Sequence, residues 1–442
     1  MTDQLRVTIE SVDYEGKGIA RVDGKTVFVD GALAGEEVLI TITKRKPSFD
    51  KAKIIEILQP SPERVTPECP NFGMCGGCSM QHVSFEEQIR IKQQVLIDNL
   101  KHLGGVEASE VLPPVKGVAW GYRHRGRLSA RYVIKKGGAL VGFREKSSPY
   151  VADMHECLVL PKHVSNLIPV LRDLISQLSI RERIPQIEVA VGSHVTILVV
   201  RNMDALSSED EALIRQMVDN NTSTEMALQI WLQPKGPETC YPFYPQEAPR
   251  LSYEIKRFTI EMPYYPSEFT QVNPYINEEM VGLAMDLLEP QANEVIADFF
   301  CGIGNFTLPI ARHAKQVVGI EGADALVKRA KQNATYNGLE DKVAYQVCNL
   351  FTIDEKWVSE LGQFDKWLID PPRDGAMELV QSITPQSAPR RIVYVSCNPA
   401  TLARDAGILV NAKGYTLVKA GIMNMFPHTS HVESIALFEL NK

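Results

Sequence analysis

The pattern of hydrophobic and polar positions changes character twice along the chain. From residue 5 to about 58, short alternating apolar runs are separated by glycine turns such as Glu15-Gly16-Lys17-Gly18 and Asp23-Gly24. Closely spaced short strands of this kind predict a small closed β-barrel of the oligonucleotide-binding type. From Tyr122 to about Ile260, strand patterns mix with helical ones. Beyond residue 263 a strand–turn–helix unit repeats, which indicates a doubly wound parallel sheet.

These patterns predict a multidomain protein, because 442 residues exceed a single ordinary core. We expect an OB-like β-barrel in residues 1–60, a central α+β domain in residues 61–262 and a Rossmann-like α/β domain in residues 263–442. The prolines of Pro60-Ser61-Pro62 mark the first linker. An apolar stripe over residues 85–104 predicts a helix. The pattern leaves open whether that helix packs on the central or the C-terminal domain.

Polar residues follow the strands predicted in the last section. They are Glu321, Asn349, Asp370 and Cys397, each at or just after the end of a strand. Because parallel strands of an open α/β sheet end at one edge, we expect a shared ligand site there. A turn with only two glycines, Gly302 and Gly304, favours a nucleoside cofactor such as S-adenosylmethionine over NAD. Glu321 would then accept from ribose hydroxyls, while Asn349 and Asp370 would meet the adenine and the methionine ammonium.

A thiol at the end of an apolar strand, Cys397 after Ile392–Ser396, is either a buried small side chain or a nucleophile. Asp370-Pro371-Pro372-Arg373 is similar to the post-strand motif of amino- and base-methylating enzymes. An exocyclic amine needs no nucleophilic cysteine, whereas carbon 5 of a pyrimidine does, because a thiolate must first add to carbon 6. A base must then remove the carbon 5 proton. His428, His431 and Glu433 compete for that role, and spacing alone does not choose among them.

Three cysteines lie within ten residues, Cys69, Cys75 and Cys78, in the spacing C-x5-C-x2-C. In a reducing compartment such a cluster indicates a metal or catalytic site rather than a disulfide scaffold. Iron–sulfur clusters and structural zinc both take four ligands, and Cys157 is the best candidate for the fourth. Cysteine count alone does not separate the two metals.

The net charge of −7 argues against a nucleic-acid partner, yet the average conceals basic stretches. Between Gly121 and Lys146 there are eight basic residues against one acid, and Lys44-Arg45-Lys46 adds a second cluster. Local basic patches are what phosphate contact requires. The chain has no apolar run long enough for a membrane span and no N-terminal secretion signal, so we expect a cytoplasmic protein without a membrane partner.

Several motifs together resemble one enzyme family. They are the TRAM-like pattern Gly-x-Gly-x-Ala-Arg at 16–21, the four cysteines, Phe269-x-Gln271-x-Asn273, Asp298-x-x-Cys301-Gly302-x-Gly304-Asn305, Asp370-Pro371-Pro372-Arg373, Ser396-Cys397-Asn398-Pro399 and His431-Val432-Glu433-Ser434. On these motifs the chain resembles the RNA uracil-5-methyltransferase superfamily along nearly its whole length. The Cys397 and Glu433 motifs together are highly specific, whereas the glycine turn is not.

The resemblance implies an RNA-binding TRAM barrel and a role for each candidate residue. It implies a [4Fe-4S] cluster on Cys69, Cys75, Cys78 and Cys157, and S-adenosylmethionine contacts at Gln271, Phe300, Asn305, Glu321, Asn349 and Asp370. It makes Cys397 the nucleophile and Glu433 the proton-abstracting base. The implied partner is 23S ribosomal RNA, and the enzyme is expected to be a monomer.

The presence of both the barrel and the cysteine cluster favours the branch that methylates uracil 1939 of 23S ribosomal RNA. Relatives that act on other ribosomal or transfer RNA uracils, or on two sites, are the alternative. A different class is an iron–sulfur redox or sensor protein that binds RNA, which would give Cys397 no role. An NAD-dependent enzyme would likewise leave Cys397 and Glu433 unexplained.

Overall fold

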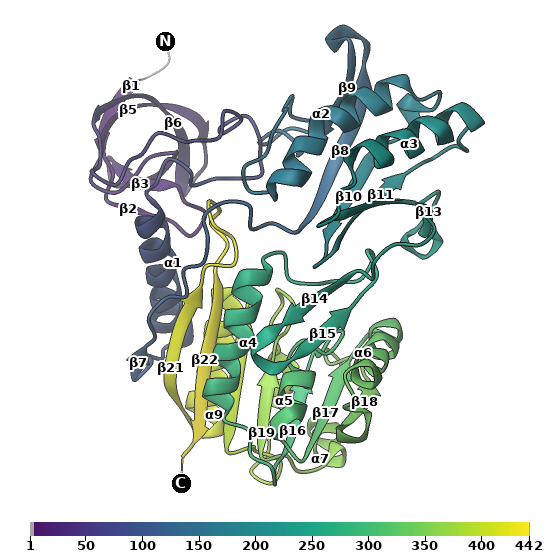
Figure 1. The fold of residues 1–442 in the computed structure, drawn as a ribbon. Helices are drawn as coiled ribbons and strands as arrows, with labels where there is room; N and C mark the ends of the chain where they lie inside the picture. Colours follow the sequence, from purple (N-terminus) through teal and green to yellow (C-terminus); the bar gives the residue numbers. More distant parts are fainter. Residues whose placement is uncertain (1–3, 442) are drawn as a thin grey trace.

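The protein, as a computed structural model, is described for residues 4–441. These residues form two six-stranded sheets, one eight-stranded sheet and a two-stranded hairpin. The N-terminal sheet and the central sheet lie side by side above the large C-terminal sheet (Figure 1). Within the described residues, no helix is long and apolar enough to cross a membrane.

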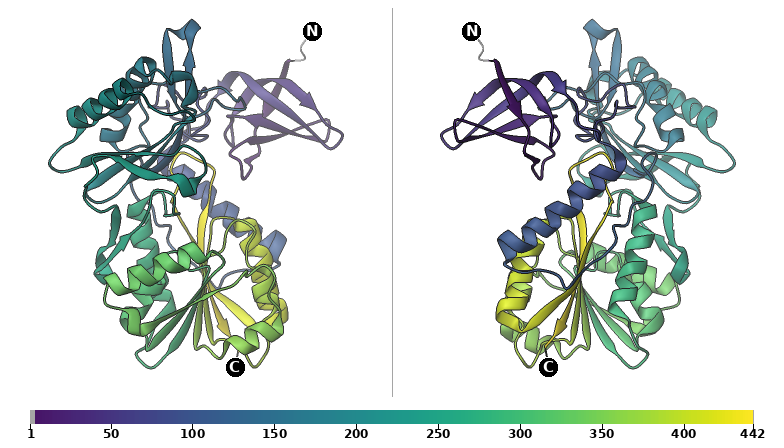
Figure 2. Two further views of the ribbon diagram at one scale, coloured as in Figure 1. Left: turned by 90° about the vertical axis from the view of Figure 1, so that its right-hand side faces the viewer. Right: turned by 90° about the vertical axis from the view of Figure 1, so that its left-hand side faces the viewer.

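The N-terminal sheet curls into a barrel (Figure 2). Its strands are β1 (Gln4–Thr8), β2 (Ser11–Val12), β3 (Gly18–Val22), β4 (Lys25–Asp30), β5 (Glu37–Arg45) and β6 (Phe49–Gln59), in the order β1-β5-β6-β4-β3-β2. Alternate residues such as Val27, Val29, Val38 and Ile40 fill its interior. Positive φ angles at Asp23 and Gly24, 50° and 77°, let the chain turn tightly between β3 and β4.

The central sheet mixes strands and helices, as the sequence pattern predicts. Its elements are β8 (Arg125–Val133), β9 (Gly138–Gly142), α2 (Lys162–Gln177), β10 (Gln186–Val191), β11 (Val195–Arg201), α3 (Ser208–Asn221), β12 (Ala227–Leu232) and β13 (Tyr241–Tyr244), and the strand order is β13-β12-β11-β10-β8-β9. One face of the sheet packs with α2 and α3 in a single core. The β8–β9 hairpin projects away from the C-terminal sheet (Figure 1).

The C-terminal sheet has the order β18-β17-β16-β19-β20-β22-β21-β7. Its strands are β7 (Glu110–Val111), β16 (Val295–Phe299), β17 (Gln316–Glu321), β18 (Val343–Val347), β19 (Lys366–Ile369), β20 (Arg391–Ser396), β21 (Tyr415–Met423) and β22 (Glu433–Leu440). Its helices are α4 (Pro274–Leu288), α5 (Thr307–His313), α6 (Asp324–Tyr336), α7 (Glu355–Leu361), α8 (Met377–Gln381) and α9 (Pro399–Lys413). Strands β16 to β20 are parallel, whereas β22 runs antiparallel between β20 and β21. The predicted Rossmann-like sheet is confirmed.

An upstream segment completes this sheet. Helix α1 (Phe85–Asn99) continues into a π-helical turn, η1 (Leu100–Gly104), and both pack on α9, while β7 pairs with β21. The contact is close, because a Cβ on Gly104 would lie 2.5 Å from the Ala403 carbonyl oxygen. The helix predicted at 85–104 therefore packs on the C-terminal sheet, although its residues precede the central sheet in the chain.

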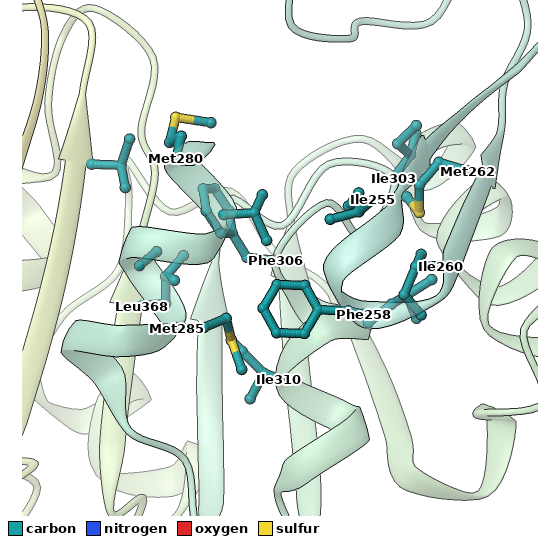
Figure 3. Packing of buried hydrophobic residues seen from close by; sticks show 14 of the residues in the cluster. Ile255, Phe258, Ile260, Met262, Met280, Met285, Ile303, Phe306, Ile310 and Leu368 are labelled. Carbon is teal, nitrogen blue, oxygen red and sulfur yellow. The ribbon is translucent and has the colours of Figure 1, made fainter. Parts of the chain in front are cut away.

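A continuous apolar cluster joins the central and C-terminal sheets (Figure 3). The hairpin β14 (Ser252–Ile255) and β15 (Ile260–Pro263) contributes Ile255, Ile260 and Met262 to it. Met280 of α4 and Leu368 of β19 meet them from the C-terminal side. The cluster extends to β11 of the central sheet. Shared close packing of this kind resists relative movement of the two sheets.

Candidate active site

Five predicted site residues lie along one edge of the C-terminal sheet. The parallel strands β16 to β20 end at Phe299, Glu321, Val347, Ile369 and Ser396. Phe300, Glu321, Asn349, Asp370 and Cys397 are at these ends or within two residues of them. The fold thus brings together side chains that are almost one hundred residues apart in the chain, as the strand-end pattern predicts.

Glu321 is fixed by the glycine turn that follows β16. Its carboxylate accepts from the Gly302 N–H at 3.1 Å and from the Ala323 N–H at 3.0 Å. Gly302 and Gly304 have φ angles of 55° and 101°, which L-residues rarely adopt. The turn therefore needs both glycines to bring its backbone against the carboxylate.

Acidic side chains accumulate beneath this turn. Burial, together with the nearby Asp370 and Glu321, raises the pKa of Asp298 to about 8, although the hydrogen bond donated by the Thr307 hydroxyl opposes this shift. Burial also raises the pKa of Asp370 to about 7. Buried carboxyls of like charge are costly unless a cation comes close to them. The sheet edge is therefore suited to a positively charged ligand.

An aromatic pair lies beside the carboxyls. Phe300 has a left-handed backbone with φ 63°, and its ring centroid is 5.7 Å from that of Phe351. Phe351 is 40% exposed, so the pair offers an apolar face to a ligand. The Asn349 side chain accepts from the Phe351 N–H at 3.1 Å, which ties the amide to the same loop.

Gln271 and Asn305 share two neighbours that the sequence did not mark. The Asn305 amide oxygen accepts from the Tyr253 hydroxyl at 2.8 Å and from Asn277 at 3.1 Å, and its nitrogen donates back to Asn277 at 2.9 Å. Tyr253 and Asn277 also line a small cavity with Gln271 and Arg125 of the central sheet. No motif includes Tyr253 or Asn277, and only folding brings them to the site.

Cys397 and Glu433 are opposed at the ends of neighbouring strands. Ser396 of β20 pairs with Ser434 of the antiparallel β22, so the next residues outward are Cys397 and Glu433. Glu433 is 2% exposed, and its burial, with the nearby Asp370, raises its pKa well above the usual value. Burial, then Glu433 and Asp370, raise the pKa of the half-buried Cys397 to about 11, which Arg373 partly opposes.

The two competing histidines are differently placed. His428 is buried, with its ring stacked on Trp120 at 3.8 Å and within 3.3 Å of the Gln88 side chain. Burial lowers the pKa of His428 to about 4. His431 is exposed and lies 3.5 Å from the Arg373 guanidinium. Of the three candidates, Glu433 is the one in register with Cys397.

Cys69, Cys75, Cys78 and Cys157 line a single cavity with apolar neighbours such as Phe143 and Met154. They are not disulfide-bonded within residues 4–441. Burial raises the pKa of Cys78 to about 11 and that of Cys157 to about 12. The fold therefore brings Cys157 to the other three cysteines from about eighty residues downstream.

The basic stretch from Arg123 to Lys146 is divided in space. Arg125 lies near the junction of the two larger sheets and donates to the Pro266 carbonyl at 2.6 Å, whereas the Arg123 guanidinium lies 5.8 Å from the ring centroid of Phe143, which lines the cysteine cavity. Further along, ion pairs neutralise part of the stretch: Arg127 with Glu188, Lys136 with Asp153 and Lys146 with Asp30. The stretch is therefore less basic in the fold than in the sequence.

Fold and site together define the class. A family model described as tRNA (Uracil-5-)-methyltransferase matches residues 254–441, and a TRAM domain model matches residues 3–55. The structure is similar to that of Pyrococcus abyssi tRNA (uracil-54, C5)-methyltransferase, with a TM-score of 0.73 and 22% identity, over 98% of this chain and 100% of that one. The protein is a uracil-5-methyltransferase of the S-adenosylmethionine-dependent class.

Curated relatives narrow the class to one family. A Chromobacterium violaceum protein is 60% identical over 99% of this chain and 85% of its own length, and a Nitrosospira multiformis protein is 55% identical over 98% of both. Each is named 23S rRNA (uracil(1939)-C(5))-methyltransferase RlmD. The chain belongs to the RlmD family. The resemblance to RNA uracil-5-methyltransferases expected from the motifs is confirmed.

Proposed function

We propose that this protein transfers a methyl group from S-adenosylmethionine to carbon 5 of uracil 1939 in 23S ribosomal RNA. The observation that carries the proposal is the opposition of Cys397 and Glu433 across β20 and β22, next to the carboxyls at the sheet edge. The RlmD relatives, which carry this activity in their name, support the choice of RNA and of uracil.

The same edge fits the methyl donor. S-adenosylmethionine supplies an electrophilic methyl on a sulfonium and also carries an ammonium. These positive charges would stabilise the ionised carboxylates of Asp370 and Asp298 and so lower their raised pKa values. Glu321 would accept from the ribose hydroxyls, with Phe300 and Asn349 at the adenine. Asp370 would take the ammonium. Asn305, which Tyr253 and Asn277 hold by hydrogen bonds, and Gln271, which lines a cavity with both of them, would close the methionine end of the site.

Cys397 and Glu433 then divide the reaction on the RNA base. The Cys397 thiol releases its proton to water, its sulfur bonds to carbon 6, and the electrons of the 5,6 double bond move onto carbon 5 and oxygen 4. Carbon 5 would then bond to the donor's methyl as the methyl–sulfur bond breaks, and the donor's sulfonium would leave as a neutral thioether. The Glu433 carboxylate then removes the carbon 5 proton, the double bond re-forms, and the carbon 6–sulfur bond breaks. The target base must leave its stack to reach both groups.

We propose a [4Fe-4S] cluster on Cys69, Cys75, Cys78 and Cys157. Within the described residues, no three His, Cys, Asp or Glu side chains lie close enough together to hold a single metal ion. A tetrahedral zinc site would bring its sulfurs to about 3.8 Å from one another. The four cysteines line one cavity with apolar neighbours and could supply the four thiolate ligands that a [4Fe-4S] cluster takes, and the family resemblance favours the cluster over zinc. Bound there, the cluster would cross-link two distant segments of the chain.

The test is methyl transfer from labelled S-adenosylmethionine to a 23S RNA fragment containing uracil 1939. We expect 5-methyluridine at that position, none when the uracil is changed to cytosine, and none with Cys397→Ala. Methylation by Cys397→Ala would contradict the mechanism. Methylation mapped to another uracil would show that the enzyme has the site specificity of the alternative relatives, which act on other uracils. Absorption spectra and metal analysis of anaerobically purified protein separate iron–sulfur from zinc.

We further propose that the enzyme works as a monomer in the cytoplasm, with the barrel and the basic segment holding the RNA around the target. The TRAM match supports RNA binding by the barrel. Light scattering of the purified protein, alone and with the RNA fragment, tests the monomer. A dimeric mass in either sample would contradict it.

A further inference from the structure

Residues 424–432, here called the base loop, connect β21 to Glu433. The loop has no regular secondary structure, yet most of it is buried. Its residue His428 has φ 64°, a left-handed backbone that costs a non-glycine residue about 1 kcal/mol or more. A strained and buried loop keeps its shape only when its surroundings determine it.

Helix α1 supplies two of these determinants. The Lys92 ammonium donates to the Asn424 side chain and to the Phe426 carbonyl, both at 2.8 Å. Lys92 is 1% exposed, and burial lowers its pKa to about 7. Gln88 accepts from the His428 N–H at 2.8 Å. Burying a lysine is expensive, so the loop contacts are the interaction that offsets the cost.

The cysteine segment supplies another determinant. The backbone N–H groups of Ser79 and Met80, which directly follow Cys78, both donate to the His428 carbonyl, at 2.9 and 3.0 Å. From the other side, the Tyr122 hydroxyl donates to the Pro427 carbonyl at 2.9 Å. The cavity of the four cysteines is thus joined to the base loop through backbone hydrogen bonds.

We propose that Lys92 and Gln88 are positioning residues that hold the base loop, and through it Glu433, against the Cys397–RNA adduct. The cysteine centre acts on the same loop through Ser79 and Met80. This inference rests on the proposed function and assigns the centre a specific task in it. A displacement of about 1 Å at the base slows proton removal by roughly a hundredfold, whereas formation of the adduct by Cys397 does not need Glu433.

Formation of the Cys397–RNA adduct and its decay after proton removal can be measured separately. A loosened base loop should leave the adduct forming normally and decaying slowly. We expect Lys92→Met to lower turnover at least tenfold while the fraction of enzyme covalently bound to RNA on denaturing gels rises severalfold. Glu433→Gln is the positive comparison. Lys101→Met, on the exposed surface just beyond α1, is the matched control and should behave as wild type.

Amide hydrogen exchange of the full chain supplies a readout that does not depend on activity. Exchange in residues 426–431 should quicken in Lys92→Met and, independently, in Cys78→Ser, while the barrel amides stay unchanged. If Lys92→Met fails to fold, Gln88→Ala removes both His428 contacts and the hydrogen bond to the Val83 carbonyl while leaving Lys92 in place, and it must show the same adduct accumulation.

Equal loss of adduct and turnover in the variant that folds would overturn the positioning role, provided that wild type methylates. Unchanged hydrogen exchange of the base loop in Cys78→Ser would contradict the role of the cysteine centre in holding that loop. Failure of wild type to methylate the RNA fragment would instead overturn the proposed function.

Discussion

Cys397 has an environment that opposes its own ionisation. Burial and two carboxyls raise its thiol pKa to about 11, and Arg373 offsets only part of this effect. The residue also precedes α9, whose N-terminal dipole favours a thiolate. Because the positive methyl donor would lie among the same carboxyls, its binding should make the thiolate easier to form. We therefore expect the Cys397 thiol to ionise more readily with the donor bound than without it.

Removal of the Glu433 carboxylate should stop the reaction at the covalent protein–RNA adduct. In Glu433→Gln the amide cannot take the carbon 5 proton, while Cys397 keeps its thiol and loses only a carboxyl that opposes its ionisation. We expect turnover to fall at least a hundredfold and a covalent protein–RNA band to accumulate on denaturing gels. The double variant with Cys397→Ala is the control and should give no band. Wild-type turnover by Glu433→Gln would assign the base to another residue.

The turnover rate should rise with pH across the neutral range. Burial and Asp370 raise the pKa of Glu433 well above its usual value, and Cys397 also starts protonated. Both groups act in their deprotonated forms, so a higher pH increases the active fraction of each. Steady-state kcat from pH 6 to 9 checks this, with RNA retention on filters as the binding control. A kcat that falls above neutral pH would contradict it.

Motif residues were predictable because their spacing carries chemistry, whereas their supports were not. Cys397, Asp370 and Glu321 follow strands, and the sequence indicates strands. Tyr253, Asn277 and Lys92 contact the site only through tertiary packing, and no local pattern distinguishes them from ordinary core residues. A buried lysine on the apolar face of α1 was the one available signal, because lysine is almost never fully buried without a partner.

At the scale of elements, α1 and η1 pack on α9 through a glycine contact. A Cβ on Gly407 would lie 2.7 Å from the Gly104 carbonyl oxygen, and a Cβ on Gly104 would lie 2.5 Å from that of Ala403. Neither carbonyl can move without shifting a helix. The pair of glycines thus sets how closely the upstream helix approaches the C-terminal sheet.

Gly407→Ala should destabilise the protein although alanine favours helix. The propensity gain is about 1 kcal/mol, while overpacking against a fixed backbone costs about 1–3 kcal/mol. We expect a lower thermal unfolding midpoint. Gly282→Ala in α4 is the matched control, because its Cβ meets only the flexible end of Arg257, and its midpoint should be unchanged or higher. A higher midpoint for Gly407→Ala would contradict the close packing.

Elements were predictable where a local period determines them. The alternation of strands and helices predicts β16 to β20 in order, since parallel strands need crossover helices. The placement of β22 between β20 and β21, which brings Glu433 to Cys397, depends on long-range pairing that no periodicity encodes. The same applies to the pairing of β7 with β21.

At the scale of the whole molecule, charge is distributed unevenly over the fold. The protein is acidic in total, yet the barrel carries Lys44 and Lys46, both exposed, at the turn between β5 and β6. The barrel lies at the opposite end of the molecule from α7 (Figure 1). An RNA held by the barrel would therefore be attracted locally although the net charge of the protein repels it.

Lys44→Gln with Lys46→Gln should weaken RNA binding and its dependence on salt. Each lost phosphate contact lowers the slope of log affinity against log salt by about 0.7 for a single strand. The rate at saturating RNA should not change, because both residues are remote from Cys397. Lys315→Gln with Lys356→Gln, at the far end of the C-terminal sheet, is the charge-matched control. Identical salt slopes for the two double variants would show that the barrel lysines do not contact the RNA.

The discontinuous C-terminal sheet has a consequence for the order in which the protein is made. Helix α1 ends at residue 99, about 300 residues before α9 begins at residue 399, so it leaves the ribosome long before α9 and β21, its packing partners, are synthesised. At about 5–20 residues per second, that interval is roughly 15–60 s. The barrel can fold as soon as it is synthesised, because its strands all lie in the first sixty residues. The apolar face of α1 stays exposed to solvent until its packing partners are made. Translation speed and chaperone supply should therefore limit the yield of active enzyme more strongly than the stability of the finished fold.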